Sequence, residues 1–286
     1  MKVLLTGAKG QLGRCFQDRL PEGWTLLATD SDELDITDAD KVSQTVQEHH
    51  PDVIVNAAAY TAVDKAESEP ELAARINVTG PQNLARAASS INARLVHVST
   101  DYVFDGKSER PYIETDPVNP LGVYGKTKLD GERMVLKEAS NSIIVRTAWV
   151  FSEYGNNFVK TMLRLGKEQD SLGIVSDQRG CPTYAGDIAG AIIQLINKDA
   201  NAGIYHYCGD KEVSWYEFAK YIFNEAADNK LIAVKPRLNS LLTIQYPTPT
   251  ERPKYSVLSC DKIISYGISL SSWRVALENI LRKMYV

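Results

Sequence analysis

The chain has 286 residues, of which 44% are hydrophobic, and a formal net charge of −4. This length and composition allow one or two domains with a large core, and the acidic balance excludes a basic footprint for nucleic acid. The apolar run at the N-terminus ends at Gly7, so we expect neither a signal peptide nor a membrane span, and we expect a cytoplasmic protein. The four cysteines lack a Cys-x-x-Cys pair, which favours small apolar thiols over disulfides, and the four histidines show no metal-ligand spacing.

The first predicted unit is a strand, a glycine turn and a helix. Lys2–Thr6 is a short apolar run typical of a buried parallel strand, and Gly7–Gly13 carries three glycines before an apolar-periodic stretch. Glycines allow a tight turn and a close approach of phosphate to backbone N–H groups. The spacing Gly-x-x-Gly-x-x-Gly departs from Gly-x-Gly-x-x-Gly, but the flanking strand and helix favour a dinucleotide site over an unliganded turn.

Three acidic residues after the second strand candidate are candidates for a local role. Asp30 lies about where a dinucleotide fold carries its ribose-binding acid, and its charge would repel a 2′-phosphate and favour NAD(H). Lys9 or Arg14 could offset that charge, although each is otherwise a surface cation. Asp35 either caps the following helix or approaches the adenine, and Asp38 is the better capping candidate.

Alternating strands and helices continue through the first half of the chain. The further strand candidates are Trp24–Thr29, Asp52–Asn56, Arg94–Thr100 and Ser142–Val150. This alternation predicts an α/β fold with a doubly wound parallel, Rossmann-like sheet. Such sheets bind ligands outside the carboxyl ends of their strands, so one crevice should collect the glycine loop, Ala57–Thr61, Ser99–Tyr102 and Trp149.

Tyr124 and Lys128 are the most informative pair in the sequence. Their spacing places both side chains on one face of a helix, where a cation lowers the phenol pKa from its usual ~10. Such a pair exchanges a proton with an alcohol or carbonyl near neutral pH. The same spacing also occurs by chance in helices, as a half-buried Tyr beside a solvated Lys. The glycine loop elsewhere in the sequence favours the catalytic interpretation. Thr100 would donate to the carbonyl oxygen, whereas the adjacent Ser99 should face the other way.

The second half of the chain is less regular. Helical stretches over 158–166, 187–197, 215–226 and 273–284 alternate with short strands over 173–175 and 203–207. Pro236–Tyr255 holds four of the twelve prolines and is interpreted as a loop. We expect a dinucleotide-binding domain over residues 1–154 and a smaller C-terminal α/β substrate lobe over residues 155–286, with some chain exchange between them. Arg252 either pairs with a diphosphate or is a solvated charge.

Eight short runs form a specific combination, although no single run is specific. They are Gly7–Gly13, Val55–Asp64, Ser99–Phe104, Tyr124–Lys128, Arg146–Val150, Gly155–Phe158, Asp177–Thr183 and Arg252–Ser256. Along essentially the whole chain this combination resembles the dTDP-4-dehydrorhamnose reductase family of extended short-chain dehydrogenases/reductases. The resemblance implies reduction of the C4 ketone of dTDP-4-dehydro-L-rhamnose to dTDP-L-rhamnose, for cell-surface polysaccharide such as lipopolysaccharide O-antigen. It also implies NADPH as cofactor, with NADH possible, and a possible homodimer.

By position, the resemblance also implies the site. Tyr124 is the proton donor, and Thr100 and Lys128 assist it. The substrate-binding candidates are Thr100, Asp101, Tyr102, Trp149, Asn157 and Arg252. The cofactor-binding candidates are Gly7, Gly10, Gln11, Leu12, Gly13, Asp30, Asp35, Ile36, Ala59, Tyr60, Thr61, Val98, Tyr124 and Lys128.

Several alternatives stay open on the residues. Sibling dehydratases carry an Asp-Glu pair after the Thr, and Tyr102 stands where the second acid would be, so elimination is poorly equipped. An epimerase or another nucleotide-sugar reductase needs the same Tyr, Lys and cofactor. A non-catalytic regulatory subunit of the same fold is a further alternative, which the presence of Thr100, Tyr124 and Lys128 disfavours.

Metal-linked dimers occur in some relatives, where acidic residues hold magnesium between two subunits. Cys15 stands at one such place in this chain, and Tyr184–Gly186 lacks the Glu that such a site would use. We therefore expect no structural magnesium.

Overall fold

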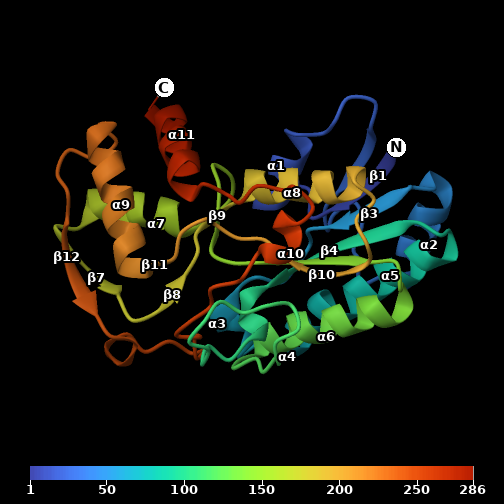
Figure 1. The fold of residues 1–286 in the computed structure, drawn as a ribbon, viewed down its shortest axis with the longest axis horizontal. Helices are drawn as coiled ribbons and strands as arrows, with labels where there is room; N and C mark the ends of the chain where they lie inside the picture. Colours follow the sequence, from blue (N-terminus) through green and yellow to red (C-terminus); the bar gives the residue numbers. More distant parts are fainter. Residues whose placement is uncertain (286) are drawn as a thin grey trace.

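The computed structural model describes residues 1–285 and centres on a six-stranded parallel sheet (Figure 1). Its strands are β1 (Lys2–Thr6), β2 (Thr25–Thr29), β3 (Val53–Asn56), β4 (Arg94–Thr100), β5 (Ile143–Thr147) and β10 (Gly203–His206). The spatial order is β10-β5-β4-β3-β1-β2, and every pairing is parallel. The chain moves from β1 to β2 on one side and to β3 on the other, so the order reverses at β1 and β3. The predicted doubly wound sheet is confirmed, with its ligand crevice expected at this reversal.

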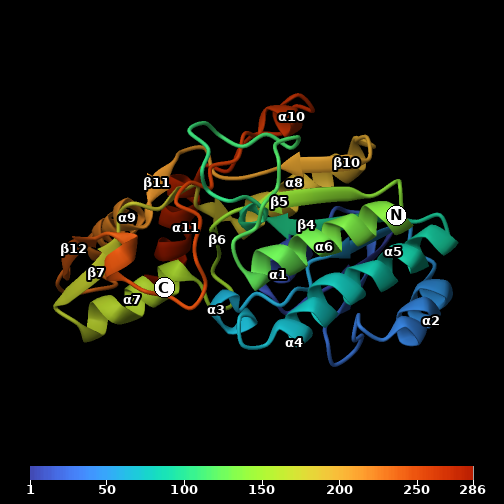
Figure 2. The same cartoon turned by 90° about the horizontal axis from the view of Figure 1, so that it is seen from below.

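Helices cover both faces of the sheet because the strands are apolar on both faces. On one face, Leu4, Ile54 and Leu95 pack in a core with α2 (Ala39–His49), α5 (Gly80–Ser90) and α6 (Val123–Glu138). On the other, Leu5, Val55 and Val96 pack in a second core with α1 (Gln11–Gln17) and α8 (Ala185–Asn197). In Figure 2, α5 and α6 run side by side beneath β4 and β5. Three short helical segments, α3 (Val63–Ala66), α4 (Pro70–Ala74) and the π-helical Arg75–Thr79, precede α5.

The second half of the chain builds a smaller lobe at the left of Figure 1. Its helices are α7 (Phe158–Glu168), α9 (Trp215–Asp228) and α11 (Trp273–Tyr285), whereas α10 (Asp261–Ile264) lies against β10 of the main sheet. Three two-stranded pairings join the lobe: β7 (Ser171–Val175) with β12 (Arg237–Leu241), β8 (Arg179–Gly180) with β11 (Val213–Ser214), and β6 (Val150–Phe151) with β9 (Thr183–Tyr184). Not all of the second half lies in this lobe, because β10 pairs with β5 in the main sheet.

Two sequence-based expectations about strands are wrong. Pro236–Tyr255 is not a continuous loop, since Arg237–Leu241 pairs with β7 along its whole length and a short 3-10 turn follows at Thr243–Gln245. Ser142–Val150 is not one strand either. It breaks after Thr147 because Trp149 has a left-handed backbone, with φ of 47°.

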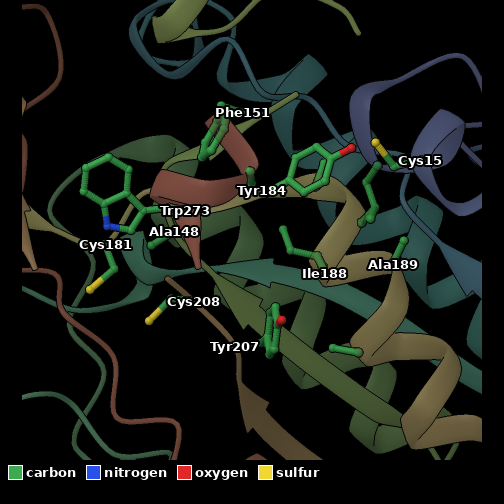
Figure 3. Close-up of a cluster of buried hydrophobic side chains, with 14 of the residues drawn as sticks. Cys15, Ala148, Phe151, Cys181, Tyr184, Ile188, Ala189, Tyr207, Cys208 and Trp273 are labelled. Carbon is green, nitrogen blue, oxygen red and sulfur yellow. The ribbon is translucent and has the colours of Figure 1, made fainter. Parts of the chain in front are cut away.

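All four cysteines are buried and free. Cys181, Cys208 and Cys260 converge in the core although they are far apart in sequence, and the sulfurs of Cys208 and Cys260 lie 3.6 Å apart. Figure 3 shows Cys181 and Cys208 beside Trp273, with Cys15 further along the same core near Ile188 and Tyr184. The expected role of these residues as small apolar side chains is confirmed. Within the described chain, no helix is long and apolar enough to cross a membrane.

Candidate active site

A cavity of about 950 Å³ opens at the carboxyl edge of the sheet. It brings together most of the candidate residues from the sequence, from both halves of the chain. They are Gly7, Gly10, Gln11, Leu12, Asp30, Asp35, Ile36, Ala59, Thr61, Val98, Thr100, Asp101, Tyr102, Tyr124, Lys128, Trp149 and Arg252.

Gly13, Tyr60 and Asn157 do not line this cavity. Gly13 packs on the turn itself, where a Cβ would lie 2.1 Å from the Gly7 carbonyl oxygen. The Tyr60 hydroxyl donates to Glu69 at 2.5 Å. Asn157 caps α7, accepting from the Lys160 N–H at 3.1 Å, and its amide donates to Gln11 Oε1 at 2.9 Å. These three residues shape the loops around the cavity.

The glycine loop lies close to the chain that follows β3. Gly7 has φ of +72°, and a Cβ there would lie 2.7 Å from the carbonyl carbon of Ala57. Only glycine adopts this conformation without strain and tolerates this approach. The loop thus presents backbone without side chains to the cavity, which fits the diphosphate of a dinucleotide.

The far end of the cavity holds charges of both signs. The Asp30 carboxylate accepts from the N–H groups of Lys9 at 2.8 Å and Ser31 at 2.9 Å. The Lys9 ammonium instead bonds to Asp32 at 2.6 Å, so it is occupied by neighbouring acids. Arg75, which sequence reasoning did not single out, lines the cavity at this end, and no acid lies within ion-pair distance of it in residues 1–285.

Asp35 and Asp38 differ in role: Asp35 lines the cavity, and Asp38 caps the following helix. The Asp35 carboxylate accepts from the Thr37 N–H at 2.9 Å and lines the cavity, and hydrogen bonding to the Thr37 backbone and side chain lowers its pKa. Asp38 caps α2 by accepting from the Lys41 N–H at 3.0 Å, as predicted.

Tyr124 and Lys128 lie on one face of α6 and both reach the cavity. The buried Lys128 ammonium donates to the Val98 carbonyl at 2.7 Å, and burial lowers its pKa to about 8 while Glu132 opposes that shift. The ring of Tyr124 is only partly buried, but burial raises the pKa of its hydroxyl and a hydrogen bond with Thr100 opposes that rise. In this structure burial raises the Tyr124 pKa, and Lys128 is not among the groups that shift it, so the lowering expected from the helical spacing stays a prediction.

The strand end beside Tyr124 carries a short chain of polar groups. The Thr100 hydroxyl donates to Asp101 at 3.0 Å and accepts from the Tyr102 N–H at 3.2 Å. Burial raises the pKa of Asp101 to about 6, against hydrogen bonds that lower it. As predicted, only Thr100 of the hydroxyl pair meets Tyr124, while the Ser99 hydroxyl is buried without a partner in the described part of the chain.

An aromatic cluster closes the other side of the cavity. Trp149 stacks on Trp215, and Phe158 lies 4.6 Å from the same ring, centroid to centroid. Trp215 and Phe158 were missed by sequence reasoning because each is simply an aromatic residue at the start of a helix. A Cβ added at Gly180 would lie 2.5 Å from the Trp149 indole, so this ring is enclosed from behind.

Arg252 reaches the cavity from the lobe. It pairs with Asp64 at 2.7 Å and donates to the Tyr102 hydroxyl at 3.4 Å. The neighbouring Thr250 donates to the Val63 carbonyl at 2.9 Å. This segment is thereby fastened to α3 of the first half, with the guanidinium in the cavity wall.

Comparison with known proteins agrees with this geometry. A family described as the RmlD substrate binding domain matches residues 1–286. A dTDP-4-dehydrorhamnose reductase of Aggregatibacter actinomycetemcomitans is 50% identical over 287 residues, covering 98% of each chain. A crystal structure of a dTDP-4-dehydrorhamnose reductase from Clostridium acetobutylicum has a TM-score of 0.95 at 41% identity, covering 100% of each chain. One from Bacillus anthracis, in complex with NADP, has a TM-score of 0.93 at 40% identity, covering 99% of each chain. The chain belongs to the dTDP-4-dehydrorhamnose reductase family.

Proposed function

We propose that this protein reduces the C4 ketone of dTDP-4-dehydro-L-rhamnose to dTDP-L-rhamnose, using NADPH and accepting NADH. The observation that carries the proposal is the meeting of Thr100, Tyr124 and Lys128 in one cavity with the glycine loop. A proton donor, an oxyanion donor and a cation beside a dinucleotide cradle are what carbonyl reduction needs.

The residues fit the cofactor because Gly7 keeps the phosphate cradle free of side chains and because Asp30 and Arg75 line the adenosine end. When bound, NADPH supplies the hydride. The Lys128 ammonium would hold the ribose next to the nicotinamide and favour the ionised form of Tyr124 as the proton leaves. Tyr124 then protonates the C4 oxygen while the Thr100 hydroxyl donates to it, so that the alkoxide never forms unassisted.

The sugar nucleotide would lie between the two halves of the chain. Trp149 offers a flat face to the sugar, Asp101 a buried carboxyl to its hydroxyls, and Arg252 a planar cation to the diphosphate. The cofactor would occupy the part built from residues 1–154 together with α8 and β10, and the lobe would cover the substrate.

Location and assembly belong to the same proposal. Buried, unpaired thiols suit a reducing compartment, which supports a cytoplasmic enzyme. We propose a homodimer without bound magnesium.

The test is a panel of dTDP- and UDP-4-keto sugars offered to the purified protein with NADPH, followed by the loss of reduced-nicotinamide absorbance. We expect the fastest loss with dTDP-4-dehydro-L-rhamnose. Interconversion of sugars without net loss of NADPH would instead identify an epimerase. Binding of NADPH with no turnover of any sugar would identify a regulatory subunit.

A further inference from the structure

Glu132 lies on α6 one turn beyond Lys128, on the helix face that also carries Tyr124. Its carboxylate forms two hydrogen bonds with Arg146, from Nε at 2.9 Å and from Nη2 at 2.7 Å. Both side chains are only 2% exposed. A buried ion pair carries a large desolvation cost, and an apolar pair of similar volume often gives equal or greater stability. Stability alone therefore does not explain the pair.

The place of the pair connects it to the catalytic residues. Arg146 lies on β5 directly opposite Ser99 of β4, one residue before Thr100. Its guanidinium also lies 5.2 Å from the centre of the Phe104 ring, which follows the same strand end. The ion pair thus joins the helix that presents Tyr124 and Lys128 to β5, the strand paired with β4, which ends in Thr100.

The charged groups around Lys128 also connect Glu132 to the catalytic residues. Its ammonium is buried and bonds to the Val98 carbonyl, a neutral group, so burial works against its charge. From β4, His97 faces it and is neutral because burial lowers the histidine pKa. Tyr124 lies on the same helix as Lys128. The cation Arg146 faces Lys128 from β5, with its ion-pair partner Glu132 between them. Glu132 supplies the negative charge that acts on Lys128.

We propose that Glu132 is a positioning residue for the reaction: pinned by Arg146, its carboxylate keeps the Lys128 ammonium charged and in place beside Tyr124. This inference rests on the proposed reductase function. Its consequence is an alkaline limit on activity and on cofactor binding that depends on Glu132.

The test compares Glu132→Gln with Glu132→Asp, measuring the pH dependence of kcat/KM and of the NADPH Kd. We expect Glu132→Gln to move the alkaline limb of both profiles to lower pH by about one unit, since the charge that holds the ammonium is gone. The aspartate should restore most of that shift. Glu138→Gln is the matched control, because Glu138 lies on the same helix and pairs with Arg86 at 2.9 Å but is remote from the cavity.

Glu132→Gln leaves Arg146 buried without its partner and can fail to fold. The double variant Glu132→Met/Arg146→Met removes both charges, and we expect it to fold with its alkaline limb still displaced. An unchanged limb in the folded double variant, with only a change in Tm, would overturn the proposal. The NADPH Kd profile separates this failure from that of the proposed function, because it is readable even if no keto sugar is reduced.

Discussion

The indole rings of Trp149 and Trp215 lie parallel, with centroids 3.4 Å apart and planes 6° apart. Trp149 comes from the turn between β5 and β6, and Trp215 is the first residue of α9, so the stack joins the main sheet to the C-terminal lobe. A left-handed backbone at a bulky residue is strained, and the enclosure of the ring by Trp215 and Gly180 is what holds it there. This aromatic contact therefore helps to set the two halves of the substrate site, together with the pairing of Arg252 and Asp64.

Replacing Gly180 by Ala should push Trp149 out of this position, because the new Cβ would lie 2.5 Å from its indole. We expect the KM for the sugar nucleotide to rise about tenfold, with the NADPH Kd unchanged and a shift in tryptophan fluorescence. Gly190→Ala is the control, since a Cβ there meets nothing within 4 Å. An unaltered KM and spectrum in Gly180→Ala would contradict this account of the stack.

Replacing Tyr124 by Phe should remove the proton donor and leave the cavity shape intact. We expect turnover to fall by a factor on the order of 10² or more, the contribution of a positioned acid, while NADPH still binds. Tyr221→Phe controls for loss of a phenol, because its hydroxyl bonds to Glu278 away from the cavity. Normal turnover in Tyr124→Phe would exclude the proposed role.

Asp101 should make the stability of the protein depend on pH. Burial raises its pKa from 3.8 to about 6, so the folded state holds this proton more tightly than the unfolded state. The resulting stabilisation is complete below about pH 4 and is lost as the pH rises through about 6. We expect Asp101→Asn, which cannot ionise, to raise the free energy of unfolding at pH 8 by roughly 2–3 kcal/mol at most, with little difference at pH 4. Urea unfolding at several pH values measures this, and a pH-independent difference would count against it.

Asp30 and Arg75 should act in opposite directions on the choice of cofactor. Asp30→Asn removes the charge that repels a 2′-phosphate, so the kcat/KM ratio of NADPH to NADH should rise. Arg75→Met removes a cation at the same end of the cavity, so the ratio should fall, in each case about tenfold. Steady-state kinetics with both cofactors measures the ratio. A shift of both variants in the same direction would show that the adenosine end is wrongly assigned.

Exhaustive EDTA treatment should leave activity and oligomeric mass unchanged. Cys15 is fully buried, and burial raises its pKa to about 12, so its thiol stays protonated and is a poor ligand for a hard cation. Assays and light scattering before and after chelation provide the test. Loss of either property on chelation would show that a metal is held elsewhere.

Local patterns predicted the parts of this structure that local chemistry determines. The parallel sheet follows from short apolar runs separated by helical ones, and the cradle follows from glycines between a strand and a helix. The face shared by Tyr124 and Lys128 follows from helical spacing alone. Their convergence with Thr100 follows from the rule that ligands bind at the carboxyl ends of strands.

Contacts between distant segments could not be predicted in this way. Arg237–Leu241 becomes a strand only because β7 offers a free edge, and nothing in its own sequence indicates that partner. Trp215 and Glu132 gain their places from residues 66 and 14 positions away, respectively. The Lys128 pKa likewise depends on how deeply the fold buries the ammonium, which spacing does not reveal.

The buried cysteines offer a way to measure how fast the core opens. Cys181, Cys208 and Cys260 are shielded together in the core, and hydrogen bonding with Cys181 and Cys260, together with burial, raises the pKa of Cys208 far above its usual range. A thiol that is both protonated and enclosed does not react with an alkylating reagent until the chain opens. The rate at which label enters these positions therefore reports the opening of the core, and cofactor or substrate bound in the adjoining cavity would slow that rate in proportion to its affinity.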